Sequence, residues 1–122
     1  MKVKRVFNFL PDKLKKSLNG YDLLFEREIQ QGIAELWEIN GGKSYAITRM
    51  EYDDYKQHTI LVVCCYEGEN IKEFADHVER VADSKQWYVR VHTENVALCN
   101  WWRKRYRFEN IEYVMTREPK HG

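Results

Sequence analysis

Carboxylates are the side chains of this sequence best suited to acid–base chemistry, and three of them lie close together. Glu51, Asp53 and Asp54 occur within a polar stretch that also contains two tyrosines. A carboxylate held next to a reacting group can accept a proton as a general base. Residues 51–57 are also typical of a solvated strand end and turn, where Asp and other polar residues are frequent. The sequence favours a strand end and turn here, and a role of one of these carboxylates as a general base stays open.

The cysteines and histidines show no pattern of a metal site. The chain has three Cys, and its four His, at positions 58, 77, 92 and 121, are never three or four residues apart. Zinc ligands occur at close, regular spacing, so we expect no metal. In a regular strand Cys64 and Cys65 point to opposite faces, and no base lies beside them to lower a thiol pKa. We therefore expect two buried, unreactive thiols in a reduced, intracellular protein.

Residues 101–108 concentrate four aromatic rings and four cations. Such a segment could stack bases and neutralise phosphates of single-stranded nucleic acid, or contact a cofactor or a protein partner. It could also be an amphipathic helix in which Leu98, one of Trp101 and Trp102, and Phe108 pack on a sheet while basic residues face solvent. The helix is favoured, and the formal net charge of +1 argues against nucleic acid.

Length and composition predict a single domain over residues 1–122. The chain is 43% hydrophobic and 14% aromatic, which supports a packed core despite 32% charged residues. Its longest apolar run, residues 60–66, is far shorter than the ~20 residues of a membrane-spanning helix. The basic N-terminus lacks the apolar core of a secretion signal. We expect a cytoplasmic protein that does not bind a membrane.

The first half of the chain predicts a strand, two short helices and a hairpin. Apolar residues alternate with basic ones at the start, and then recur at four-residue spacing in the two helices. Asn40-Gly41-Gly42 is a hairpin turn signal. The expected elements cover residues 4–9, 11–18, a helix from about residue 22, and strands over 36–39 and 44–48.

The second half predicts alternating strands and helices. Residues 59–66 are rich in β-branched side chains, which is typical of a central strand covered on both faces. Apolar positions on one face between Ile71 and Ala82 predict a helix. Because a strand over residues 87–92 follows, the two strands around this helix are expected to be parallel. A helix from Asn95, its candidate cap, to about residue 107 and a last strand over 111–115 complete the prediction.

This order, β-α-α-β-β-β-α-β-α-β, together with residues 59–116, resembles the GNAT superfamily of acyl-CoA N-acyltransferases. In that family the strand that corresponds to 59–66 leads into a loop and helix that hold the cofactor pyrophosphate. A later helix carries an Asn near its start, and residues 95–109 look like this helix. The resemblance implies an α/β fold with a mixed, mostly antiparallel sheet of about six strands, flanked by about four helices.

The resemblance implies acetyl-CoA or another acyl-CoA as cofactor. The family's loop, Q/R-x-x-G-x-G/A, closes consecutive backbone N–H groups around phosphate oxygens. Here residues 67–72 correspond to it, with Glu67, Asn70 and Lys72 at the three signature positions. The main chain of the preceding strand is expected to pair with the pantetheine arm. The residues assigned to cofactor binding are Val63, Cys64, Cys65, Gly68, Glu69, Asn70, Ile71, Lys72, Asn95 and Trp102.

Acyl transfer to an amine needs a base for the amine and an acid for the departing thiolate. The family often places a carboxylate in or after the third strand, which implies Glu51 as the base. Its acid is a Tyr seven residues after the helix Asn, but that position is Trp102, whose indole does not give up a proton near neutral pH. Tyr106, one turn further on, is the candidate acid.

Two functions are compatible with these features. The first is transfer of an acyl group from acyl-CoA to an amine of a small molecule or a protein. The alternative is an inactive GNAT-fold protein with a degenerate phosphate loop that serves as a binding or structural module, for example with a protein partner. The small size is similar to that of phage proteins. A monomer and a homodimer paired through residues 111–115 both stay open.

Overall fold

The computed structural model describes residues 1–7, 10–18, 20–92 and 96–106. These residues form five strands and four helices. In chain order the elements are β1 (Val3–Val6), α1 (Asp12–Ser17), α2 (Asp22–Gln30), β2 (Glu35–Ile39), β3 (Ser44–Asp53), β4 (His58–Gly68), α3 (Ile71–Lys85), β5 (Tyr88–Val91) and α4 (Val96–Tyr106). The predicted strand over 111–115 and the cap at Asn95 lie outside the described residues.

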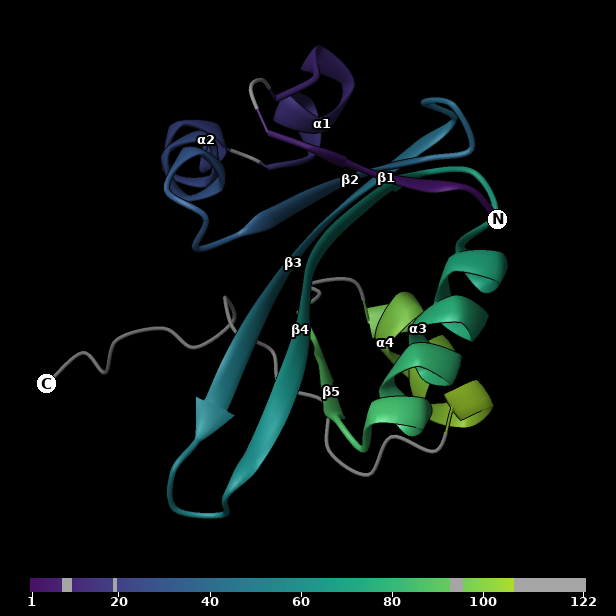
Figure 1. Ribbon diagram of the computed structural model, residues 1–122. Coiled ribbons are helices and arrows are strands. Elements are labelled where there is room, and N and C mark those ends of the chain that lie inside the picture. The colour runs from purple at the N-terminus through teal and green to yellow at the C-terminus, as the bar shows by residue number, and fades with distance from the viewer. Residues whose placement is uncertain (8–9, 19, 93–95, 107–122) are drawn as a thin grey trace, which may run out of the picture.

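The strands form one sheet in the order β1-β2-β3-β4-β5. Successive pairs are antiparallel except β4 and β5, which are parallel, as predicted for the two strands around α3. Helices α1 and α2 cover one face of the sheet, and α3 and α4 lie on the other (Figure 1). This is the expected α/β fold with a mixed, mostly antiparallel sheet. No helix in the described part of the chain is long and apolar enough to span a bilayer.

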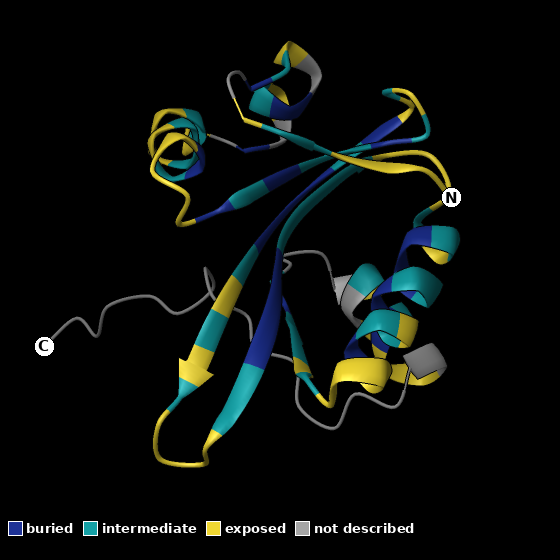
Figure 2. Cartoon of the chain, viewed as in Figure 1, coloured by how far each residue is buried: buried dark blue, intermediate teal, exposed yellow. Residues whose placement is uncertain are grey.

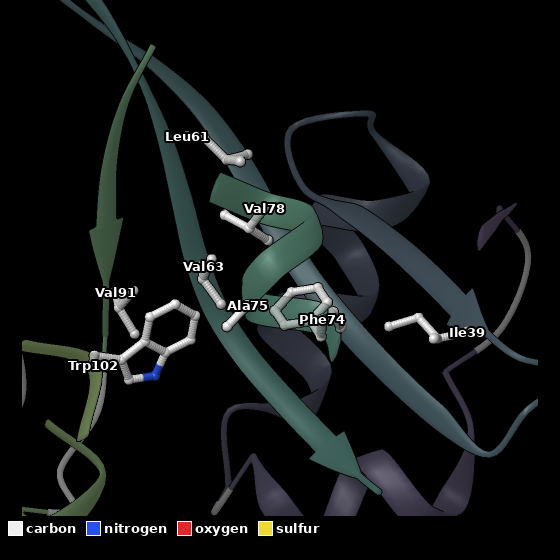
Figure 3. Close-up of a cluster of buried hydrophobic side chains, with 9 residues drawn as sticks. Ile39, Leu61, Val63, Phe74, Ala75, Val78, Val91 and Trp102 are labelled. Carbon is white, nitrogen blue, oxygen red and sulfur yellow. The ribbon is translucent and has the colours of Figure 1, made fainter. Parts of the chain in front are cut away.

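Each face of the sheet has its own hydrophobic core, and the buried segments of β3 and β4 run between the two (Figure 2). β4 is buried over residues 60–63, so the prediction of a strand covered on both faces is confirmed for this part; residues 64–66 are half-buried, and β4 is the fourth of the five described strands. The N-terminal cluster consists of Leu10, Leu14, Leu18, Ile29, Ala34, Leu36 and Ile47. The C-terminal cluster consists of Ile39, Ala46, Leu61, Val63, Phe74, Ala75, Val78, Val91 and Trp102 (Figure 3).

Helix α3 forms where the sequence predicts it because its apolar residues fall on one face. Phe74, Ala75, Val78 and Ala82 are buried against the sheet, and each large apolar side chain contributes about 1.5–3 kcal/mol of transfer free energy. The helix ends at Gln86, which takes the left-handed conformation and donates its N–H to carbonyls of the last turn. This helix fixes the end of β4 relative to the start of β5.

Helix α4 is amphipathic, as favoured by the sequence. Leu98 and Trp101 pack against the C-terminal cluster, and Trp102 is part of it with 2% of its surface exposed. Figure 3 shows the Trp102 ring beside Val91 on the sheet. Arg103 and Lys104 are exposed. The described part of the basic aromatic segment therefore packs as a surface helix.

Candidate functional site

The ladder between β3 and β4 contains a β-bulge at Cys64. Ile47 pairs with Cys65 and Thr48 pairs with Val63, so Cys64 has no opposite residue on β3. An extra residue of this kind interrupts the side-chain alternation of a strand. As a result Cys64 and Cys65 both pack against the N-terminal cluster. The expectation that they point to opposite faces was wrong, because it assumed a regular strand.

The ladder between β4 and β5 ends at the same place. β5 pairs with β4 only over residues 60–63, and the N–H of His92 donates to the carbonyl of Val63 at 3.0 Å. β4 continues along β3 through residues 64–68, beyond the last strand pairing with β5. We call this stretch of β4 the β4 edge. The main chain of such an edge can pair with an extended ligand as a further strand would.

The β4 edge leads directly into the N-terminus of α3. Gly68 has φ +126°, and a Cβ there would lie 2.5 Å from the carbonyl oxygen of Lys43. Asn70 precedes the helix in the left-handed conformation, with φ 57° and ψ 49°. Asn tolerates this conformation better than most residues, so it can stand where the signature has a glycine. The first N–H groups of a helix have no intrahelical acceptor and face an anion favourably.

Charged side chains surround this turn. Lys72 forms an ion pair with Asp76, with Nζ 2.8 Å from Oδ2. The N-terminal ammonium group of Met1 lies 3.7 Å from Oε1 of Glu73. Glu69 and Lys72 are exposed, while Ile71 is half-buried. Both signs of charge are thus present at the start of α3.

The two thiols are half-buried and weakly acidic. Burial raises the pKa of Cys64 to about 11 and that of Cys65 to about 12. Desolvation of the thiolate is the largest cause in both cases. The thiols are protonated at neutral pH, as expected, which favours the main chain of these residues over their sulfur atoms as the functional part.

Four charged residues form a row on the face of the sheet that carries α1 and α2. Arg49 pairs with Glu28 of α2, with Nε 2.9 Å from Oε1, and Arg90 pairs with Glu51, with Nη1 3.3 Å from Oε2. Arg49 and Arg90 both lie opposite Val62 in their ladders, so they share its face. The charges of Arg49, Glu28 and Glu51 all act on the Cys64 thiol. This charged row therefore lies beside the bulge.

The acidic stretch separates into two roles. Glu51, on β3, forms an ion pair with Arg90. The Asp53 carboxylate instead accepts hydrogen bonds from the backbone N–H groups of Tyr55 at 3.0 Å and Lys56 at 3.1 Å. The hydrogen bond from Lys56 is the main reason for the lowered pKa of Asp53. Asp53 is thus the last residue of β3, and its carboxylate stabilises the turn that follows, in line with the strand end and turn that the sequence favoured. Glu51 lines a shallow pocket with Tyr52, Asp53, Asp54, Tyr55, Ile60 and Arg90.

The structure brings some predicted site residues together and separates others. Cys64, Cys65, Gly68, Glu69, Asn70, Ile71 and Lys72 follow one another along the β4 edge and the start of α3. Val63 and Trp102 are 3% and 2% exposed, so their side chains pack in the core. Trp102 therefore has almost no surface that a ligand could contact. Asn95 and the side chain of Tyr106 lie outside the described residues. Within the described ranges, no cluster of His, Cys, Asp and Glu could hold a metal ion.

Sequence reasoning missed several residues at this site. Glu28, Arg49 and Arg90 come from three elements and meet only in the folded chain. Ser44 and Tyr66 are 22 residues apart, yet their hydroxyl oxygens are 2.9 Å apart. No local spacing could have indicated these contacts, because they depend on the strand register.

Comparison of the fold with solved structures identifies acetyltransferases. No protein-family model and no curated protein sequence matches the chain. The crystal structure of a probable acetyltransferase matches with a TM-score of 0.69 and 10% identity, covering 100% of both chains. The ribosomal-protein-alanine N-acetyltransferase of Brucella melitensis biovar Abortus 2308 matches with a TM-score of 0.64 and 12% identity, over 97% of this chain and 100% of that one. A protein of Thermus thermophilus matches with a TM-score of 0.52 and 18% identity, over 97% of each chain.

The chain has the GNAT fold. Two of these structures are described as acetyltransferases and agree with it over nearly its whole length. At identities of 10% and 12% the agreement concerns the fold and not a particular activity.

Proposed function

We propose that this protein transfers an acyl group from an acyl-CoA, with acetyl-CoA as the first candidate, to an amine. One observation carries the proposal: the bulge at Cys64, the end of the β4–β5 ladder at Val63 and the N-terminus of α3 follow one another along β4. An extended ligand with a phosphate group fits this order, since a strand edge binds its arm and a helix N-terminus binds its anion. The fold match to acetyltransferases supports the same ligand.

In this proposal the cofactor is held mainly by the main chain. The pantetheine arm pairs with the main chain of the β4 edge, and the pyrophosphate accepts hydrogen bonds from the backbone N–H groups at the start of α3. The left-handed Asn70 supports this, because it gives the turn a backbone shape that a glycine would also allow. Lys72 lies in the first turn of α3 and contributes positive charge there.

The chemistry is a nucleophilic substitution at the thioester. The amine attacks the acyl carbonyl, a C–N bond forms and the C–S bond breaks; the amine loses one proton and the departing thiolate gains one. We assign the first proton to Glu51, whose carboxylate is oriented by Arg90 in the charged row beside the bulge. The amine then approaches from the face that carries α1 and α2. Tyr106 of α4 remains the candidate acid for the thiolate.

The alternative function is an inactive GNAT-fold module that binds a partner. In the sequence, this alternative is supported by the absence of the signature glycines from the phosphate loop. Asn70 weakens this argument, since it adopts the backbone conformation that glycine would provide. We therefore favour acyl transfer.

The proposal is tested by following thiol release from acetyl-CoA with diamines, amino acids and lysine-containing peptides as acceptors. We expect one acceptor class to raise thiol release above the amine-free rate, with the acylated amine identified by mass. Glu51→Gln should lower kcat by about 10²- to 10⁴-fold without changing the affinity for acetyl-CoA. Glu79→Gln on α3, on the opposite face, is the matched control. Binding of acetyl-CoA without transfer to any class would establish the binding module instead.

A further inference from the structure

The carbonyl group of Glu69, in the turn between β4 and α3, is held by two hydroxyl groups. Ser44 Oγ donates to the Glu69 carbonyl oxygen at 2.8 Å. The hydroxyl of Tyr66 lies within hydrogen-bond reach of both this oxygen and Ser44 Oγ, the latter at 2.9 Å. We call this arrangement the Glu69 clamp. It joins the first residue of β3, the end of β4 and the turn.

The clamp is set in a tightly packed place. Ser44 is 2% exposed. A Cβ on Gly68 would lie 2.7 Å from the Cα of Ser44, so β3 and the turn are in direct backbone contact. The Tyr66 ring packs on Phe74 of α3 with centroids 4.7 Å apart. The two hydroxyl groups therefore have little freedom to release the carbonyl.

A fixed carbonyl fixes the next amide. In a trans peptide the C=O and N–H groups point in opposite directions. With the Glu69 carbonyl directed at Ser44 and Tyr66, the N–H of Asn70 is directed away from them. Asn70 then turns in the left-handed conformation into α3. Consecutive N–H groups in such a turn form a concave site for an anion.

We propose that Ser44 and Tyr66 are positioning residues that hold this turn in shape for the pyrophosphate of an acyl-CoA. This inference rests on the proposed function. The two hydroxyl groups supply, through side chains, a turn geometry that the sequence of residues 67–72 does not specify by glycines. The two hydroxyl groups act through the Glu69 carbonyl and do not touch the cofactor; the main chain of Tyr66 still belongs to the β4 edge that pairs with the arm.

The test compares two ligands by calorimetry on the purified full chain: acetyl-CoA, and S-acetylpantetheine, which has the same arm without the pyrophosphate. Tyr66→Phe keeps the ring on Phe74 and removes the hydroxyl; Ser44→Ala removes the other. Each should raise the Kd of acetyl-CoA about fivefold, the effect of one hydrogen bond, and leave the Kd of S-acetylpantetheine unchanged. Tyr88→Phe, which removes an exposed hydroxyl about 20 Å away along the sheet, is the control and should change neither.

Each outcome is decisive. An equal rise in both Kd values would overturn the inference, because a general loosening of the fold weakens both ligands. Unchanged Kd values in both variants would also overturn it while leaving the proposed function intact. Wild-type protein that binds no acetyl-CoA would overturn the proposed function together with the inference. If Tyr66→Phe lowers the folded population, Ser44→Ala, which leaves all ring packing in place, gives the same comparison.

Discussion

The amide of His92 donates to the carbonyl of Val63 at 3.0 Å, and the pairing of β4 with β5 ends at this bond. The next residue of β4, Cys64, is the bulged residue of the ladder with β3. Two irregularities in different strand pairs therefore occur at adjacent residues. Together they make a strand edge that starts at the sheet centre and ends at the N-terminus of α3, which is why we consider this place the site.

Removal of both thiols should leave cofactor binding intact. If the main chain of β4 holds the arm and the side chains do not contact it, Cys64→Ala/Cys65→Ala changes the Kd of acetyl-CoA by less than about twofold, or about 0.4 kcal/mol. Calorimetric titration of the two proteins side by side measures this. A loss of tenfold or more would mean that the sulfur atoms contact the ligand.

The same double variant tests the pH dependence of stability. The folded pKa values of about 11 and 12 lie above the ordinary thiol value of 9.0. Protonated thiols are thus favoured by folding: their contribution to stability is fully present below about pH 9 and is lost as the pH rises through 11 to 12. Denaturant titrations at pH 7 to 10.5 should show a steeper loss for the wild-type protein than for Cys64→Ala/Cys65→Ala. Parallel curves would show that the thiols are accessible to water.

Gly68→Ala should destabilise the chain by about 3 kcal/mol, because a side chain there is strained and meets backbone atoms. Its Cβ would lie 2.5 Å from the Lys43 carbonyl oxygen. Gly32→Ala is the matched control, since Gly32 also has positive φ but no atom within 4 Å of a built Cβ. It should cost only about 1 kcal/mol. Equal losses in chemical denaturation would show that β3 and β4 do not approach closely at Gly68.

Trp102→Ala should lower the free energy of unfolding by about 3–5 kcal/mol, as for other buried aromatic residues. The ring fills the C-terminal cluster between α4 and the sheet. Trp102→Phe should lose less, and Arg103→Ala, at an exposed position of the same helix, should stay within about 0.5 kcal/mol of the wild-type protein. A small change in the free energy of unfolding for Trp102→Ala would show that the ring lies at the surface, where it could contact the cofactor.

Local patterns were sufficient to predict most of the fold. The apolar face of α3, the Asn40-Gly41-Gly42 turn and the β-branched run of β4 each specify an element from neighbouring residues. Their order then favours a parallel β4–β5 pair and the GNAT resemblance. β4 is longer than the predicted strand over residues 59–66, because it continues to Gly68.

The site was harder to predict because its geometry depends on register. Nothing about two adjacent Cys residues in an apolar run distinguishes a bulge from a regular strand. Ser44 reaches the Glu69 carbonyl only because β3 starts opposite Gly68. Arg90 meets Glu51 across β4, so neither partner can be inferred from spacing along the chain.

Calorimetric titration of the purified protein with acetyl-CoA, paired with thermal unfolding in its presence, tests the central proposal most directly. We predict saturable heat and a rise in Tm. At 100 times Kd the bound cofactor stabilises the fold by about 2.7 kcal/mol, and each kcal/mol raises Tm by about 4 °C in a domain of this size. No heat and no shift in Tm at millimolar acetyl-CoA would contradict the account of the β4 edge and the start of α3 as a cofactor site.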